Sequence, residues 1–236
     1  MTEPVVFLPG LMCDTRLFEP QLMLLGRERP VMVAPITGGE RIEEIASGLL
    51  PLLPAKFALA GLSMGGIVAM EILRRAPERV TRLALMDTEP LAETPQVAAW
   101  REPLIVKARA GGLEAALAEV LRPEHLAAGP RRLDVLARMR EMAHDLGPGV
   151  FVKQMRALQR RRDQQGALRR LRAPTLVLCG AEDTLTPVKR HSFMAELIPN
   201  AVLRLIEGAG HIPTLEAPEA TNRALQDWLA QPYVLR

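Results

Sequence analysis

The stretch at residues 57–76 constrains this chain most, because it predicts a strand, a tight turn and a helix in direct succession. The turn, GLSMG at residues 61–65, matches the pattern G-x-S-x-G, in which a strained serine exposes its Oγ. The residues before the turn are uniformly apolar, as in a strand buried on both faces, and those after it separate apolar from charged positions at helical spacing. We therefore predict that Ser63 is a nucleophile.

Composition indicates a folded chain with enough apolar residues for one sizeable core. The chain has 236 residues, 48% of them hydrophobic. Its first residues have no basic leader region, and no run reaches the roughly 18 apolar residues of a membrane span, so we expect a cytoplasmic protein with no membrane partner. Cys13 and Cys179 form neither a disulfide framework nor a metal-ligand pattern, and we expect both to be reduced and either buried or half-buried.

Strands and helices alternate along most of the chain. Apolar runs predict strands at residues 5–8, 29–36, 57–60, 80–86, 174–179 and 201–206. Helical patterns follow at residues 15–25, 39–53, 64–76, 187–197 and 218–230. This alternation predicts an α/β fold with a doubly wound, mostly parallel sheet of about six strands. In such sheets the chemistry lies at the carboxyl ends of the strands.

One interval, residues 89–172, contains helical patterns and no strand pattern. Helices are predicted there at residues 95–110, 113–121, 130–145 and 150–162. We therefore expect a core formed by residues 1–88 and 173–236, with a helical lid of residues 89–172 inserted after the fourth strand. The residues expected to face inward from the lid are aliphatic or soft: Leu104, Ile105, Leu113, Leu117, Leu133, Leu136, Met139, Met142, Phe151 and Met155.

The lid is basic. Residues 101–172 hold sixteen Lys and Arg against eight Asp and Glu, a net charge of +8. This charge either attracts anionic substrates or belongs to solvated helix surfaces, and the run Arg160-Arg161-Arg162 favours the second interpretation. Trp100 and Phe151 are the only aromatic residues of the lid, too few for stacking on bases, so no nucleic-acid partner is expected.

A serine hydroxyl needs a base to remove its proton, and the chain has four histidines. His125 and His144 lie in the lid and His191 lies on a helix, where partly exposed, solvating side chains are usual. His211 instead follows glycines directly after the last predicted strand, at the edge where Ser63 also lies. We therefore predict that His211 is the base.

The histidine needs an acid that orients it and stabilises its charged form. Asp183 follows the fifth predicted strand at the same edge, and is the predicted acid. Asp87, after the fourth strand, is a competing candidate, whereas Glu182 is expected to be exposed. The oxyanion of the reaction would be bound by two backbone N–H groups, that of Met64 after the nucleophile and that of Leu11 after the first strand.

Together these motifs resemble the α/β-hydrolases, in particular small Ser-His-Asp carboxylesterases and enol-lactonases. The motifs are GLSMGG at residues 61–66, GAEDTLTP at 180–187, GAGH at 208–211 and EAPE at 216–219. The chain order Ser63, Asp183, His211 is also that of the family. Relatives usually place His-Gly in the oxyanion loop, where this chain has Pro9-Gly10, and their two leading strands are missing here, so a reduced, six-stranded parallel sheet is expected.

The resemblance implies a hydrolase of small-molecule esters that needs no cofactor and no metal and acts as a monomer or homodimer. The soft lid, with Met139, Met142 and Phe151 expected at the substrate, favours a broad carboxylesterase for uncharged short to medium acyl esters, extending to lactones and aliphatic polyesters. The basic lid favours an alternative, a hydrolase or lyase for a carboxylate-bearing metabolite, such as an enol-lactonase or carbon–carbon hydrolase. A non-enzymatic ligand receptor on the same fold is a third hypothesis.

Overall fold

A six-stranded parallel sheet forms the centre of the molecule. The structure, a computed structural model, describes residues 2–232. The sheet order is β2-β1-β3-β4-β5-β6, and every strand pair is parallel, which confirms the predicted fold class. The strands are β1 (Val5–Leu8), β2 (Val31–Val33), β3 (Phe57–Leu62), β4 (Val80–Met86), β5 (Thr175–Gly180) and β6 (Ala201–Ile206).

The edge strand β2 is shorter than the predicted strand at residues 29–36. Pro30 and Pro35 flank it, and a proline has no N–H to donate to a neighbouring strand. The N–H of Ala34 still donates to the carbonyl of Phe7, at 3.0 Å, so one hydrogen bond continues the pairing past the strand end.

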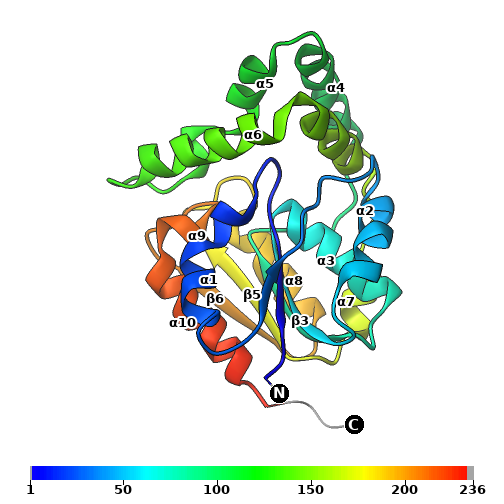
Figure 1. Cartoon of the computed structure of the whole chain (residues 1–236), viewed down its shortest axis with the longest axis vertical. Helices are drawn as coiled ribbons and strands as arrows, with labels where there is room; N and C mark the ends of the chain where they lie inside the picture. Colours follow the sequence, from blue (N-terminus) through cyan, green and yellow to red (C-terminus); the bar gives the residue numbers. More distant parts are fainter. Residues whose placement is uncertain (1, 233–236) are drawn as a thin grey trace.

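Helices cover both faces of the sheet (Figure 1). One face packs against α1 (Glu19–Leu25) and α10 (Pro218–Ala230), the other against α2 (Ile42–Leu49), α3 (Met64–Arg75) and α8 (Val188–Leu197). Short turns of helix, η1 (Thr15–Phe18), η2 (Leu50–Leu52) and α9 (Pro213–Glu216), complete the layers. In β1, Val5 and Phe7 enter one apolar core while Val6 and Leu8 enter the other, because successive side chains of a strand point to opposite faces.

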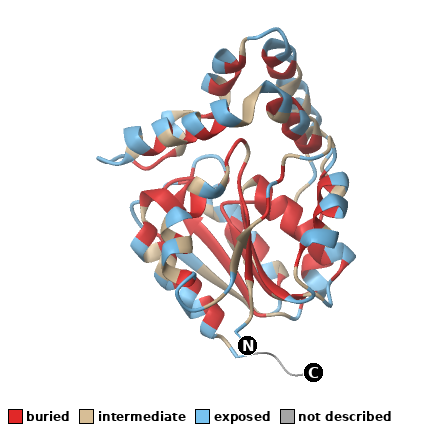
Figure 2. Ribbon diagram, viewed as in Figure 1, coloured by how far each residue is buried: buried red, intermediate tan, exposed pale blue. Residues whose placement is uncertain are grey.

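The predicted helical insertion follows β4 and lies across the carboxyl edge of the sheet (Figure 1). It comprises α4 (Pro95–Arg109), α5 (Leu113–Val120), η3 (Pro123–His125) and α6 (Arg132–Gln159). The two helices predicted at residues 130–145 and 150–162 both fall within α6, where Gly147 has a φ of 76° and a ψ of 175° and so kinks the chain. Figure 2 shows exposed residues on the outer surfaces of these helices and buried strands below them.

Most of the lid residues expected to face inward are buried. Leu133 is the exception, since it is 71% exposed. It lies in the first turn of α6, which begins beyond the edge of the core (Figure 1), so no facing layer covers it. The apolar pattern alone could not show how far the helix extends.

Helix α7 (Gln165–Arg170) departs from the predicted lid boundary. It packs against α3 and α8 beside the sheet rather than over its edge. We therefore propose that the lid ends before α7, near residue 162, instead of at residue 172. In the part of the chain that the structure describes, no helix combines the length and the apolar character needed to cross a membrane.

Candidate active site

Ser63 lies in a sharp turn between β3 and α3. Its φ of 54° and ψ of −117° are strained for a residue with a side chain, and its N–H donates to the carbonyl of Met86 at 2.9 Å. A Cβ at Gly61 would lie 2.4 Å from the carbonyl oxygen of Gly65, and one at Gly65 would lie 2.0 Å from that of Leu8. The two glycines of the motif are therefore required for the close approach of strand and helix.

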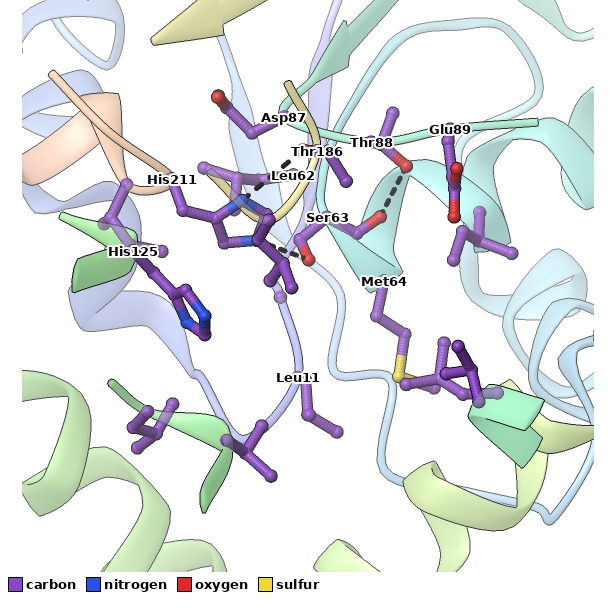
Figure 3. Close-up of a pocket in the computed structure, with 18 of the residues that line it drawn as sticks. Leu11, Leu62, Ser63, Met64, Asp87, Thr88, Glu89, His125, Thr186 and His211 are labelled. Carbon is purple, nitrogen blue, oxygen red and sulfur yellow. Dashed lines mark hydrogen bonds between the residues drawn. The ribbon is translucent and has the colours of Figure 1, made fainter. Parts of the chain in front are cut away.

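The structure brings Ser63 together with the predicted histidine and acid. The Nε2 of His211 lies 2.9 Å from the Oγ of Ser63 (Figure 3), and its Nδ1 lies 2.8 Å from Oδ2 of Asp183. A carboxylate at Nδ1 favours the tautomer with its proton there, which leaves Nε2 free to accept the serine proton. The arrangement can therefore activate Ser63 for attack on a carbonyl carbon.

Asp183 is held as an anion by its surroundings. Its Oδ1 accepts the N–H groups of Leu185 and Thr186, at 2.8 and 3.0 Å, and its Oδ2 accepts the Thr186 hydroxyl at 2.6 Å. Burial acts to raise the pKa of this carboxyl, but the charge of His211 and these hydrogen bonds outweigh it, so the pKa lies below its ordinary value.

The competing acid, Asp87, has a different environment. It is fully buried, and its Oδ1 accepts the N–H of Gly180 at 2.9 Å. Burial, followed by the nearby charge of Asp183, raises the pKa of Asp87 well above its usual range, so a negative charge on this carboxyl is disfavoured. The ionised carboxylate beside His211 is therefore that of Asp183. Glu182 is exposed, as predicted.

The two predicted oxyanion donors, Leu11 and Met64, both line the cavity beside Ser63 (Figure 3). Met64 is the first residue of α3, where backbone N–H groups have no partner within the helix. Leu11 lies in the turn after β1, and the next residue, Met12, has a positive φ of 54°.

Gln154, which no sequence motif indicated, holds this turn in place. Its side chain is fully buried; its Oε1 accepts the N–H of Met12 at 2.8 Å, and its Nε2 donates to the carbonyl of Ile36 at 3.2 Å. A polar residue on the buried face of the predicted helix was the available signal. Gln154 therefore ties the lid to the loop that carries Leu11.

We expect Gln154→Leu to lower kcat for ester hydrolysis by about 10- to 100-fold with little change in KM, because a displaced oxyanion donor weakens transition-state binding. Steady-state kinetics on a nitrophenyl ester will measure this. Gln164→Leu is a matched control, since Gln164 is also buried and donates to Glu71, at 2.9 Å, away from Ser63. Equal losses in both variants would show that general destabilisation, not the turn, is responsible.

The other histidines differ from one another. His144 is half-exposed and lies 2.7 Å from Glu114, in agreement with a solvated role. The expectation for His191 is wrong: it is fully buried, its Nε2 accepts the N–H of Thr88 at 3.1 Å, and burial lowers its pKa to about 4. The hydroxyl of Thr88 in turn donates to the carbonyl of Ser63, at 2.8 Å. His191 therefore supports the loop behind the nucleophile only while it is neutral.

We expect the free energy of unfolding to fall by about 3 kcal/mol between pH 6.5 and 4 because of His191. In this window the unfolded chain binds a proton at this histidine, with an ordinary pKa of 6.5, whereas the folded chain, with a pKa of about 4, does not. Urea unfolding at several pH values will show this slope, and His191→Gln should lose it. His144→Gln is the control, because His144 is half-exposed. Parallel acid profiles for His191→Gln and the wild type would contradict the assignment.

A cavity of about 490 Å³ lies between the lid and the carboxyl edge of the sheet. Met139 lines it, as predicted, together with Leu121, Leu126 and Leu136. Met142 and Phe151 do not line it; both are fully buried in the apolar core between the lid and the loop after β1, where the sulfur of Met142 accepts the N–H of Asp14. Met139 and Met142 lie on the same helical segment before the kink at Gly147, so apolar spacing alone could not show which of them reaches the cavity.

The end of the cavity near the start of α4 is charged. Arg161 pairs with Glu89 at 2.6 Å and Glu93 at 3.1 Å, Arg101 pairs with Glu93 at 2.9 Å, and Arg190 pairs with Glu89. These side chains join the first segment of the lid to its last and to α8. The inward arginines are therefore already neutralised in large part.

Two groups of possible metal ligands lie near this site. Atoms of Asp87, Cys179 and His191, and of Asp87, Asp183 and His211, lie within 4.8 Å of one another. Protein hydrogen bonds already occupy Oδ1 of Asp87, Nε2 of His191, both carboxylate oxygens of Asp183 and both ring nitrogens of His211, whereas Oδ2 of Asp87 has no partner among the described residues. Most of these atoms therefore already have protein partners. Cys179 and Cys13 are both free and buried, as predicted.

Comparisons with known proteins agree with this geometry. The family model described as "alpha/beta hydrolase fold" matches residues 40–218. The chain is 30% identical to a pimeloyl-[acyl-carrier protein] methyl ester esterase of Aromatoleum aromaticum, over 80% of each chain, and 27% identical to 3-oxoadipate enol-lactonase 2 of Acinetobacter baylyi, over 80% of this chain and 71% of the relative.

A solved structure of similar shape is a thermophilic esterase from Thermogutta terrifontis, with a TM-score of 0.89 and 28% identity, which covers 97% of this chain and 90% of its own. The match extends over the core and the lid. The chain therefore belongs to the α/β-hydrolase family, within its esterase and enol-lactonase-like group.

Proposed function

We propose that the protein cleaves carboxylic esters through an acyl-enzyme on Ser63. The observation that carries this proposal is the hydrogen-bonded series from Ser63 through His211 to Asp183, with its serine end in the cavity. His211 takes the Oγ proton as Oγ attacks the ester carbonyl, and returns it to the leaving alcohol. The N–H groups of Leu11 and Met64 stabilise the oxyanion, and water then releases the acid by the same steps in reverse.

The lining of the cavity favours uncharged esters with short to medium acyl groups as substrates. Lactones and aliphatic polyesters would be further substrates. The walls of the cavity are mainly aliphatic, and its arginines are paired with glutamates. Such walls discriminate weakly between acyl groups, since one methylene contributes only about 1 to 3 kcal/mol. We therefore propose a carboxylesterase of broad range that requires no cofactor.

A second candidate is a hydrolase or lyase for a carboxylate-bearing substrate, as an enol-lactonase or carbon–carbon hydrolase would be. One observation favours it: three arginines but only two glutamates form the charged end of the cavity. A substrate carboxylate would balance the remaining positive charge. Arg190 is the member to test, because its side chain is 45% exposed and can turn to a ligand.

A panel of nitrophenyl esters separates the two candidates. Neutral acyl esters of increasing length are compared with matched esters that carry a free carboxylate, in the wild type and in Arg190→Gln. We expect multiple turnovers of the neutral series, which a ligand receptor would not support. A preference above about 100-fold for the carboxylate series, lost in Arg190→Gln, would instead establish the second candidate.

A further inference from the structure

The lid segment that carries His125 is hydrogen-bonded to the loop of His211. The N–H of His211 donates to the carbonyl of His125 at 2.8 Å. Two residues on, the N–H of Ala127 donates to Oε2 of Glu216 at 2.6 Å, and the same carboxylate accepts the N–H groups of Gly210 and Ile212, at 2.9 and 2.8 Å. The backbone at His125 therefore keeps a fixed place relative to the base.

The same segment also contacts the turn that holds Asp183. The hydroxyl of Thr184 donates to the carbonyl of Glu124 at 3.0 Å, and the N–H of Ala128 donates to Oε2 of Glu182 at 3.2 Å. A Cβ at Gly210 would lie 2.4 Å from the carbonyl oxygen of His125, so the approach is as close as backbones allow. A side chain mounted on this segment is therefore positioned as firmly as one on the core.

The ring of His125 lines the cavity beside His211 (Figure 3). It is half-buried, and it makes no hydrogen bond with any other described residue. Burial, followed by the charge of His211, holds its pKa below the ordinary value, so the ring is neutral at neutral pH. It therefore presents one N–H donor and one nitrogen acceptor to whatever occupies the cavity.

The other polar side chains of the cavity wall near Ser63 are already engaged. The Thr88 hydroxyl donates to the carbonyl of Ser63, the Thr186 hydroxyl donates to Asp183, and Oδ1 of Asp87 accepts from Gly180, while Oδ2 of Asp87 has no partner in the described part of the chain but is buried away from the cavity surface. The arginines and glutamates at the charged end are paired with one another. His125 is thus the polar group on this part of the wall whose hydrogen bonds remain for a ligand.

This inference rests on the ester hydrolysis proposed above, because that reaction determines which half of the ester lies beside His125. His211 returns its proton to the leaving oxygen, so the alcohol half of the ester must lie beside the His211 ring. His125 lies beside the same ring (Figure 3). We propose that His125 binds the alcohol half of the substrate, and that the preferred esters carry a hydroxyl or carbonyl group on their alcohol, close to the ester oxygen.

Two esters with one acyl group test this. 2-Hydroxyethyl butanoate and propyl butanoate differ only in a hydroxyl for a methyl at the end of the alcohol. We expect His125→Leu to lower kcat/KM for the hydroxyethyl ester about 10-fold relative to the propyl ester, because a buried hydroxyl then lacks its partner. His125→Gln, which keeps a donor and an acceptor, should retain most of the preference. His144→Leu, in the same lid, should leave the ratio unchanged.

Binding gives a second measurement that does not depend on turnover. In a Ser63→Ala background, adding His125→Leu should weaken binding of the hydroxyethyl ester about 10-fold relative to the propyl ester. Equal changes for both esters, or none, in kinetics and binding would overturn the assignment to His125. A wild type that cleaves neither ester would overturn the proposed function, while the binding ratio would still decide the role of His125.

Discussion

Replacing Ser63 with alanine is expected to lower kcat for ester hydrolysis by about 10⁶-fold, while the protein stays folded. Without Oγ the acyl-enzyme cannot form, and only binding and the oxyanion donors remain to accelerate attack by water. Steady-state kinetics on a nitrophenyl ester, with thermal unfolding as the check on the fold, will measure both effects. Mass spectrometry after treatment with a serine-directed phosphonate should find the label on Ser63.

The chain supplies its own controls for this experiment, since its other serines are Ser47 and Ser192. The hydroxyl of Ser47 donates to the carbonyl of Glu43 on the exposed surface of α2, and Ser47 does not line the cavity. Ser47→Ala and Ser192→Ala should keep wild-type rates and still take up the phosphonate. A label on either serine, or full turnover by Ser63→Ala, would contradict the assignment of the nucleophile.

Asp183→Asn is expected to lower kcat by about 10⁴-fold, far more than Asp87→Asn. An amide at position 183 can present an N–H to Nδ1 of His211, which favours the wrong imidazole tautomer and leaves no charge to stabilise the imidazolium. Burial raises the pKa of Asp87 and so disfavours its charged form, and an amide oxygen there can still accept the N–H of Gly180. Its replacement by asparagine therefore changes little.

Kinetics at neutral pH on both variants will rank the two acids. Both positions are buried, so unfolding curves are needed to show that each variant remains folded. The opposite ranking, with the larger loss in Asp87→Asn, would transfer the role of the acid to the residue after β4. Similar losses would mean that the pair acts as one unit across the carboxyl ends of β4 and β5.

The sheet could be predicted from the sequence because the patterns that indicate its strands and helices are local. The GLSMG turn forces a strand and a helix together, and the apolar runs alternate with helical patterns, so the parallel order and the placing of Ser63, Asp183 and His211 at one edge could be predicted. The short β2 could have been anticipated from its two flanking prolines.

Other features depend on contacts between distant segments. His191 is buried because it contacts Thr88 in the loop after β4, and Gln154 is buried because it contacts Met12 in the loop after β1. His125 lies at the cavity because its backbone pairs with that of His211. No spacing rule in the sequence connects these segments. Likewise, Met139 reaches the cavity, whereas Met142 packs against the loop after β1 and Phe151 is buried in the core.

The carboxylate of Glu216 has a consequence for protein engineering. It belongs to the core, yet it binds backbone groups on both sides of the boundary, those of Gly210 and Ile212 next to the base and that of Ala127 in the lid. The lid can therefore not be exchanged by itself, from its first residue to its last, for the lid of a relative. A chimera that carries the lid of a relative must also carry that relative's counterpart of residues 208–216. Otherwise the carboxylate at position 216 would face a lid backbone that it does not fit.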